Sequence, residues 1–170
     1  NIDILSGEVE LITRRLISET ALTDLVFGVD GGNDREVVLK ADLFREMEKV
    51  FTEYTYVESI CFYNSDNLSL IADKEQNILI NDKDSRGRFY EEQIAGKGNG
   101  AGNGVKWYGG YINSDFNIKA LKDESRKEVY YVSACRPVYW GAHTAWLVIN
   151  INLDYFTDIY NSLEKENIQL

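Results

Sequence analysis

The start of the chain carries apolar residues at a helical period. Five of them alternate in steps of three and four, and these are Ile2, Leu5, Val9, Ile12 and Leu16. This spacing places them on one face and predicts a helix that runs to about residue 19. Such a face can form a coiled-coil seam or pack on a domain core. Because only two heptads are visible, we expect it to pack on the core.

A second amphipathic segment follows a glycine-rich stretch. The sequence GVDGGND, which begins at Gly28, is typical of a loop. After it, apolar residues recur at helical spacing, and these are Leu39, Leu43, Phe44, Met47, Val50 and Phe51. They predict a helix over about residues 40–53, so two helices precede the first strand.

From Thr55 onward the pattern changes to β-branched and aromatic residues, which favour strands. The first run is a hairpin whose turn contains residues 64–67, and further strands are expected over about 106–113, 128–139 and 145–153. The last two are separated only by the short turn in YWGAHT. Because consecutive strands are mostly joined by short turns, the sheet of about five strands is expected to be antiparallel.

Two more helices are expected around these strands. The first is short, with Asp82 or Asp84 as its cap, Phe89 and Tyr90 on it, and Gly96 as its end. The second is C-terminal and begins at the predicted cap Asp154. The fold class is therefore α+β, with a long N-terminal helix packed on the sheet and a C-terminal helix. The face opposite the N-terminal helix would be covered by the short helix and loops, which leaves room for a concave site.

Composition excludes several functions. The formal net charge is −10, and no basic run exceeds a pair such as Arg14-Arg15, so a nucleic acid would be repelled. The two cysteines, Cys61 and Cys135, lie far apart in strand-like runs without zinc or CxxC spacing, and we expect buried thiols, with a disulfide as the alternative in an exported domain. No apolar stretch is long enough to span a membrane. Aromatic residues make up 12% of the chain, which suits either strands or a ligand pocket.

No motif indicates an enzyme. The sequence GKGNGAGNG at residues 96–104 lacks the GK[ST] ending of a phosphate-binding loop and precedes a strand, so it is read as an ordinary loop. His143, the single histidine, lies in a turn without a recognisable nucleophile. Carboxylate pairs such as Glu91-Glu92 are frequent in an acidic protein, and nothing places two of them across a cleft. We therefore expect no catalytic residues, metal or cofactor.

Arg136 stands out within a strand. Alternation along YYVSACRPV puts Tyr131, Ser133 and Cys135 on one face and Arg136, with Ala134, on the other. A buried guanidinium needs an anionic partner, since leaving it unpaired would cost several kcal/mol. Either one of the 28 acidic side chains or a bound ligand could supply that anion. The sequence leaves both alternatives open.

The order of several segments resembles a known family. These segments are RFYEEQ, a glycine-bearing loop, KWYGGY, YYVSACRPV, a turn glycine and AWLVININLDYFTDIY, spread over about residues 84–163. Together they resemble the extracellular Cache-type, PAS-like sensor domain of membrane-bound two-component histidine kinases from Gram-positive bacteria. Members commonly have Trp-Tyr where this chain has Phe89-Tyr90, a Trp matched by Trp107 and an Arg matched by Arg136. The chain departs from that pattern in Phe89 and in its glycine-rich insertion.

The resemblance implies a single extracellular sensor domain over residues 1–170. Residues 1–27 would form the membrane-proximal helix and its exit, 40–153 the sheet-containing core, and 154–170 a C-terminal helix leading to the membrane. It also implies a homodimeric receptor in the cell membrane, with both flanking spans outside this sequence. Because the chain begins at Asn1 without Met, we expect a piece of a longer protein. That whole protein would be a histidine kinase, while this domain would be non-enzymatic and transmit binding of a small solute through its C-terminal helix.

Five residues are candidates for ligand binding: Phe89, Tyr90, Trp107, Tyr131 and Arg136. The aromatic side chains favour stacking on a sugar-like solute, whereas Arg136 favours a carboxylate, and both ligand classes stay open. Since Tyr131 and Arg136 have opposite parity, a single pocket takes only one of them unless a bulge intervenes. Alternatives are the sensor domain of a chemoreceptor or of a membrane-bound transcription regulator. A secreted carbohydrate-binding or glycan-active domain is a further alternative, and two acidic residues facing each other across a cleft would favour it.

Overall fold

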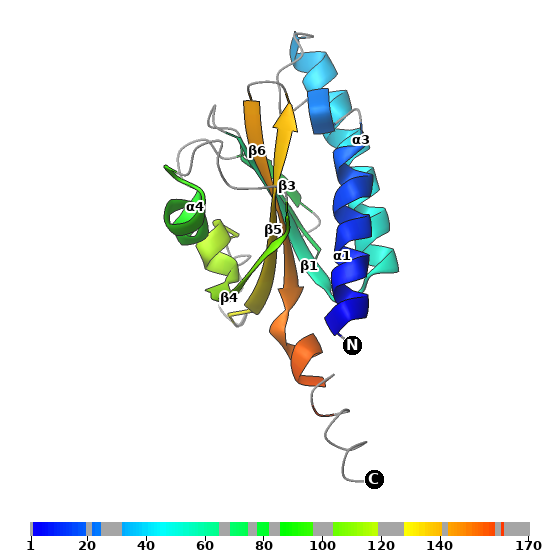
Figure 1. Cartoon of the computed structure of the whole chain (residues 1–170). Coiled ribbons are helices and arrows are strands. Elements are labelled where there is room, and N and C mark those ends of the chain that lie inside the picture. Colours follow the sequence, from blue (N-terminus) through cyan, green and yellow to red (C-terminus); the bar gives the residue numbers. More distant parts are fainter. Residues whose placement is uncertain are drawn as a thin grey trace.

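The chain folds around one antiparallel sheet (Figure 1). The computed structural model describes residues 2–19, 22–24, 32–64, 69–74, 78–81, 86–96, 104–118, 128–140, 143–158 and 161. Within these residues the sheet has six strands in the order β3-β2-β1-β6-β5-β4. The strands are β1 (Val57–Asn64), β2 (Ser69–Asp73), β3 (Ile78–Asn81), β4 (Lys106–Ile112), β5 (Tyr130–Trp140) and β6 (His143–Asn152). The helices are α1 (Ile2–Ile17), α3 (Gly32–Glu53), α4 (Gly87–Gln93) and the 3-10 helix η1 (Asn113–Phe116), and residues 153–158 are also helical.

The predicted α+β class and the antiparallel pairing are confirmed. The short edge strand β3 adds to the strands that the sequence indicated. Helix α3 begins at Gly32, eight residues before its predicted start at residue 40. Residues 34–38 are exposed, so this first part of the helix has no buried face and leaves no apolar period in the sequence.

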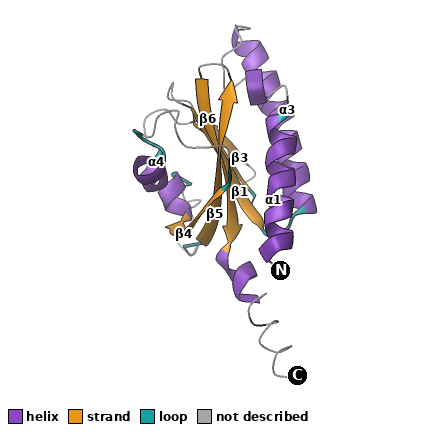
Figure 2. Ribbon diagram, viewed as in Figure 1, coloured by secondary structure: helices purple, strands orange, loops and turns teal. Residues whose placement is uncertain are grey.

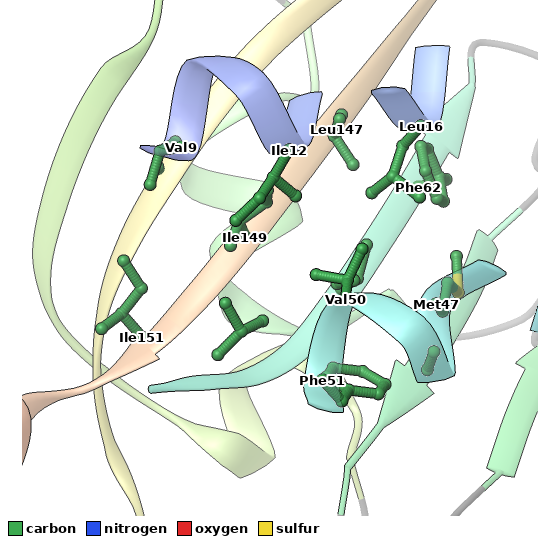
Figure 3. Packing of buried hydrophobic residues seen from close by; sticks show 14 of the residues in the cluster. Val9, Ile12, Leu16, Met47, Val50, Phe51, Phe62, Leu147, Ile149 and Ile151 are labelled. Atoms are coloured by element: carbon green, nitrogen blue, oxygen red, sulfur yellow. The ribbon is translucent and has the colours of Figure 1, made fainter. Parts of the chain in front are cut away.

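Helices α1 and α3 cover one face of the sheet, which we call the helix face (Figure 2). The apolar stripe of α1 is buried there, with Val9 and Leu16 fully inaccessible, so its packing on the core is confirmed. Figure 3 shows the contact between α1, α3 and strands β1 and β6. Each fully buried aliphatic side chain of this kind contributes about 1.5–3 kcal/mol of transfer free energy.

The opposite face of the sheet, which we call the distal face, carries a second core covered by α4 and η1 (Figure 1). Its buried apolar residues are Cys61, Tyr63, Ile71, Phe89, Ile94, Tyr111, Phe116, Ile118, Tyr131, Cys135, Trp146 and Val148. Both cysteines are buried thiols, as predicted. Cys61 and Cys135 are the two cross-strand neighbours of Val148, so two strand spacings, roughly 10 Å, separate them. That distance exceeds the reach of a disulfide.

Two predicted helix caps are wrong. Helix α4 begins at Gly87 with Arg86 at its N-cap, so neither Asp82 nor Asp84, which lie outside the described residues, occupies that position. At the C-terminal helix, Asn152 takes the place predicted for Asp154, because its Oδ1 accepts a hydrogen bond from the Asp154 N–H at 2.9 Å.

The first and last helical segments lie at the same end of the sheet. Figure 1 shows the beginning of α1 beside the lower ends of the strands and residues 153–158 just below them. Tyr155 and Phe156 pack against the core of the helix face, to which α1 also contributes. Within the described residues, no helix combines the length and hydropathy needed to cross a bilayer.

Candidate functional site

The structure divides the five sequence-predicted residues between the two faces of the sheet. Phe89, Tyr90 and Tyr131 belong to the distal face. Trp107 is the register partner of Ala134, which is part of the core of the helix face, so Trp107 and Arg136 share the other side. Trp107 is 39% exposed at the edge of the sheet. The parity argument about Tyr131 and Arg136 therefore holds, and one pocket does not collect all five residues.

Arg136 finds its anion inside the protein. Its Nη1 lies 3.0 Å from Glu10 Oε2 in α1, and it also donates to Thr13 Oγ1 at 3.3 Å. The side chains of Arg136 and Glu10 are 22% and 39% exposed, so this is a half-buried pair that joins α1 to β5. Of the two alternatives that the sequence left open, the internal carboxylate is the one present.

Arg88 holds helix α4 against η1 and strand β4. Its guanidinium donates to both carboxylate oxygens of Asp115, at 2.9 and 3.0 Å, and to Glu92 at 2.9 Å, while it lies 4.8 Å from the ring centroid of Tyr111. The hydrogen bond from Arg88 holds the pKa of Asp115 below its ordinary value. This clamp orients α4 so that Phe89 points inward, where it is fully buried.

Phe89 acts as the packing centre of this cover. Its ring centroid lies 4.7 Å from that of Phe116 in a stacked arrangement and 4.8 Å from that of Tyr111 edge to face. Tyr108 approaches it edge to face at 5.5 Å. Because Phe89 is fully buried among these rings, it supports the residues of the distal face by packing.

Next to Phe89, a cluster on the distal face contains two buried hydroxyl groups without a nitrogen or oxygen hydrogen-bond partner. We call it the Tyr63 cluster, and it comprises Tyr63, Ser69, Arg86, Tyr90 and Trp146. Ser69 and Trp146 are the two cross-strand partners of Tyr63, so all three side chains lie on the same face. Among the described residues, neither Tyr63 Oη nor Ser69 Oγ has a nitrogen or oxygen hydrogen-bond partner, and the polar group near Tyr63 Oη is the weakly hydrogen-bonding Cys61 thiol.

Arg86 and Tyr90 complete the Tyr63 cluster. The Tyr90 ring centroid lies 5.3 Å from that of Tyr63, and the Arg86 guanidinium lies 4.4 Å from the Tyr90 centroid. Arg86 is only 6% exposed and donates to the Asn64 carbonyl at 2.9 Å. Burial, followed by the nearby Cys61 thiol, raises the pKa of Tyr63 well above its ordinary value. The cluster thus combines neutral hydroxyl groups, aromatic faces and a buried cation.

A second polar group on the distal face is fully satisfied. Asp73, Ser59, Asn150 and Ser133 form one cross-strand row over β2, β1, β6 and β5. Ser133 Oγ donates to Asn150 Oδ1 at 2.6 Å, and Asn150 Nδ2 donates to Ser59 Oγ at 2.8 Å. Asn150 is fully buried, and its side-chain amide is bonded within the sheet.

A depression elsewhere on the described surface is a weaker candidate for a ligand site. An open depression of about 390 Å³ lies beside α3, lined by Glu48, Phe51, Thr52 and Lys74, and Lys74 already donates to the Thr55 carbonyl. In the described ranges, no group of three or more His, Cys, Asp or Glu side chains is placed to hold a metal ion.

Sequence reasoning missed four residues of the cluster: Tyr63, Ser69, Arg86 and Trp146. Alternation along β1 places Tyr63 on the same face as Cys61, and this signal was available. The absence of a partner for its hydroxyl was not, because that depends on β2 and α4 in three dimensions. The burial of Arg86 at the start of α4 likewise has no sequence pattern.

The fold is shared with solved structures of sensory and extracellular domains. No protein-family profile and no curated protein sequence matches the chain. Solved structures do match its fold. One is the extracellular domain of a protein described as a histidine kinase, with 13% identity, a TM-score of 0.59, and 92% of this chain and 55% of that chain covered. The predicted sensor-domain fold is thereby confirmed.

Two further structures have the same fold. One is a domain of a sensory box/GGDEF family protein from Vibrio parahaemolyticus, with 14% identity, a TM-score of 0.59, and coverage of 92% of this chain and 57% of that chain. The other is the sensory domain of the Campylobacter jejuni chemoreceptor Tlp3 with isoleucine bound, with 10% identity, a TM-score of 0.56, and coverage of 89% and 53%. The chain therefore spans little more than half the length of these proteins.

Proposed function

We propose that this chain is the extracellular ligand-sensing domain of a membrane receptor and binds a small solute at the Tyr63 cluster. The observation that carries the proposal is the pair of buried hydroxyl groups of Tyr63 and Ser69, which have no nitrogen or oxygen partner among the described residues. A buried polar group without a partner costs about 1–3 kcal/mol, and a bound polar ligand would recover that free energy. The sensor-domain fold supports the same function.

The cluster favours a small carboxylate over a neutral sugar. Arg86 is a buried cation beside the hydroxyl groups, and a guanidinium matches the planar geometry of a carboxylate. Tyr90 and Trp146 would contact the apolar part of the ligand, while Phe89 and Tyr131 would shape the floor. Arg136, which is paired with Glu10, has no part in this site.

For the whole receptor, we propose a homodimeric histidine kinase in the cell membrane, in which this single domain signals through the helix after Asn152. The sequence resemblance and one of the structural matches support this output. A chemoreceptor is the second candidate, because the Tlp3 sensory domain has the same fold. The domain itself is proposed to be non-catalytic in either case.

The proposal predicts opposite effects of Tyr63→Phe on stability and on binding. Removing a buried hydroxyl without a nitrogen or oxygen partner should raise the free energy of unfolding by about 1 kcal/mol. The same change should weaken ligand binding, because the ligand loses a hydrogen bond. Urea denaturation would measure the first effect. A thermal-shift screen with free amino acids, short dicarboxylates and hexoses would find the ligand class, and calorimetry on both proteins would measure the second.

Tyr111→Phe is the matched control. Tyr111 lies on the same face, but its hydroxyl accepts a hydrogen bond from Gln93 at 2.8 Å, so the same substitution should destabilise the protein by about 1 kcal/mol. A loss of stability in Tyr63→Phe as large as that in Tyr111→Phe would argue against an unfilled site. Unchanged affinity in Tyr63→Phe for the ligand found by the screen would place binding elsewhere.

A further inference from the structure

One residue, Tyr56, contacts both the first and the last helical segment. It lies in the connection between α3 and β1 and is 9% exposed. Its hydroxyl donates to Glu8 Oε2 in α1, while its ring stacks on Tyr155 with a centroid distance of 4.7 Å and an interplanar angle of 28°. Its backbone carbonyl accepts the Asn152 N–H at 3.2 Å, and Asn152 caps the C-terminal helix.

These contacts differ from the polar attachment of α1 to β5. Glu10, two residues further along the same helix, reaches Arg136 on β5. Arg136 pairs with Leu147 in the middle of β6, five residues before the end of that strand. The Glu8 contact, in contrast, reaches the point where β6 ends and the last helix begins.

The hydroxyl of Tyr56 is a permanent donor. Burial, together with the Glu8 carboxylate, raises the pKa of Tyr56 far above its ordinary value, so the phenol stays protonated at physiological pH. A neutral phenol that donates to a carboxylate makes a charge-assisted hydrogen bond, which is stronger than one between neutral groups. The link from α1 to Tyr56 is therefore a stable part of the fold.

We propose that Tyr56 couples α1 mechanically to residues 153–158, so that the position of the last helix depends on the position of the first. A shift of α1 along the helix face would move Glu8 and with it the Tyr56 ring on which Tyr155 rests. This coupling is independent of which ligand binds on the distal face. Tyr56 is attached to the C-terminal end by a ring stack on Tyr155 and by a backbone hydrogen bond from Asn152. Through these two contacts a rearrangement of α1 would change the position of residues 153–158.

Glu8→Ala tests the coupling, because within the described residues Glu8 is connected to the last helix through Tyr56. We expect amide exchange at residues 156–158, measured on the full 170-residue chain, to become about fivefold faster in Glu8→Ala and in Tyr56→Phe. These are the first amides of the segment that can make helical hydrogen bonds. The double variant should exchange no faster than the faster single variant, because both remove the same bond.

Glu10→Ala is the matched control, since it removes a carboxylate from the same helix and breaks the attachment to Arg136. It should change exchange at residues 156–158 by less than about twofold, with β6 amides recorded in every variant to correct for global stability. Wild-type exchange rates in Glu8→Ala would overturn the proposal. Equal acceleration in Glu10→Ala, or no protection of residues 156–158 in the wild type, would overturn it as well.

Discussion

Gly87→Ala is expected to lower the free energy of unfolding by about 3 kcal/mol or more. Gly87 begins α4 with φ +84°, in the left-handed region that side chains other than glycine adopt only at a cost. An added Cβ would also lie 2.3 Å from the Asp115 carbonyl oxygen, which is shorter than any real contact of this kind. Because the obstacle is backbone, either α4 or η1 has to move.

Gly96→Ala separates the two causes. Gly96 also has a positive φ, +72°, but a Cβ there would meet no atom within 4 Å. It should cost only about 1 kcal/mol, the penalty of the left-handed conformation alone. Urea denaturation of the two variants measures the difference. Similar losses in both would mean that α4 does not sit against η1 as described.

Asn150→Ala is expected to cost about 3 kcal/mol, although asparagine is not a core residue by type. Its amide joins Ser133 on one side to Ser59 on the other, and all three side chains are fully buried. Alanine would leave two hydroxyl groups without their partner and open a small cavity in the middle of the sheet. The midpoint and slope of urea unfolding give the change in free energy.

Asn152→Ala is the comparison on the same strand. Asn152 is half-buried, caps the last helix and donates to Glu58 at 3.3 Å. Loss of a cap costs about 1 kcal/mol, so this variant should be clearly milder. If Asn150→Ala proved as mild as Asn152→Ala, the buried hydrogen bonds of Asn150 would not be holding β5, β6 and β1 together.

The sequence predicted those elements whose buried side follows from the spacing of apolar residues within the element itself. The apolar stripe of α1 and the alternation along β5 each state which side of the element is buried, and the structure agrees. The exposed start of α3 and the four-residue β3 carry no such pattern. Helix caps were wrong at both α4 and the last helix: α4 has Arg86 at its N-cap without a side-chain capping hydrogen bond, and the last helix is capped by Asn152, two residues before the predicted Asp154.

The candidate site was only partly visible in the sequence. Parity placed Tyr131 and Arg136 on opposite faces, but it could not identify Glu10, 126 residues away, as the partner of Arg136. For the same reason, Tyr63 and Ser69 look like ordinary strand residues. What sets them apart is that no nitrogen or oxygen atom described in the structure meets their hydroxyl groups, and no sequence pattern records an absent contact.

The most direct test is an NMR titration of the isotope-labelled chain with the ligand class found by the thermal-shift screen. Binding at the distal face predicts that the largest chemical-shift changes fall on Tyr63, Ser69, Arg86, Tyr90 and Trp146. Changes centred on Trp107 and Arg136, on the other side of the sheet, would contradict the account.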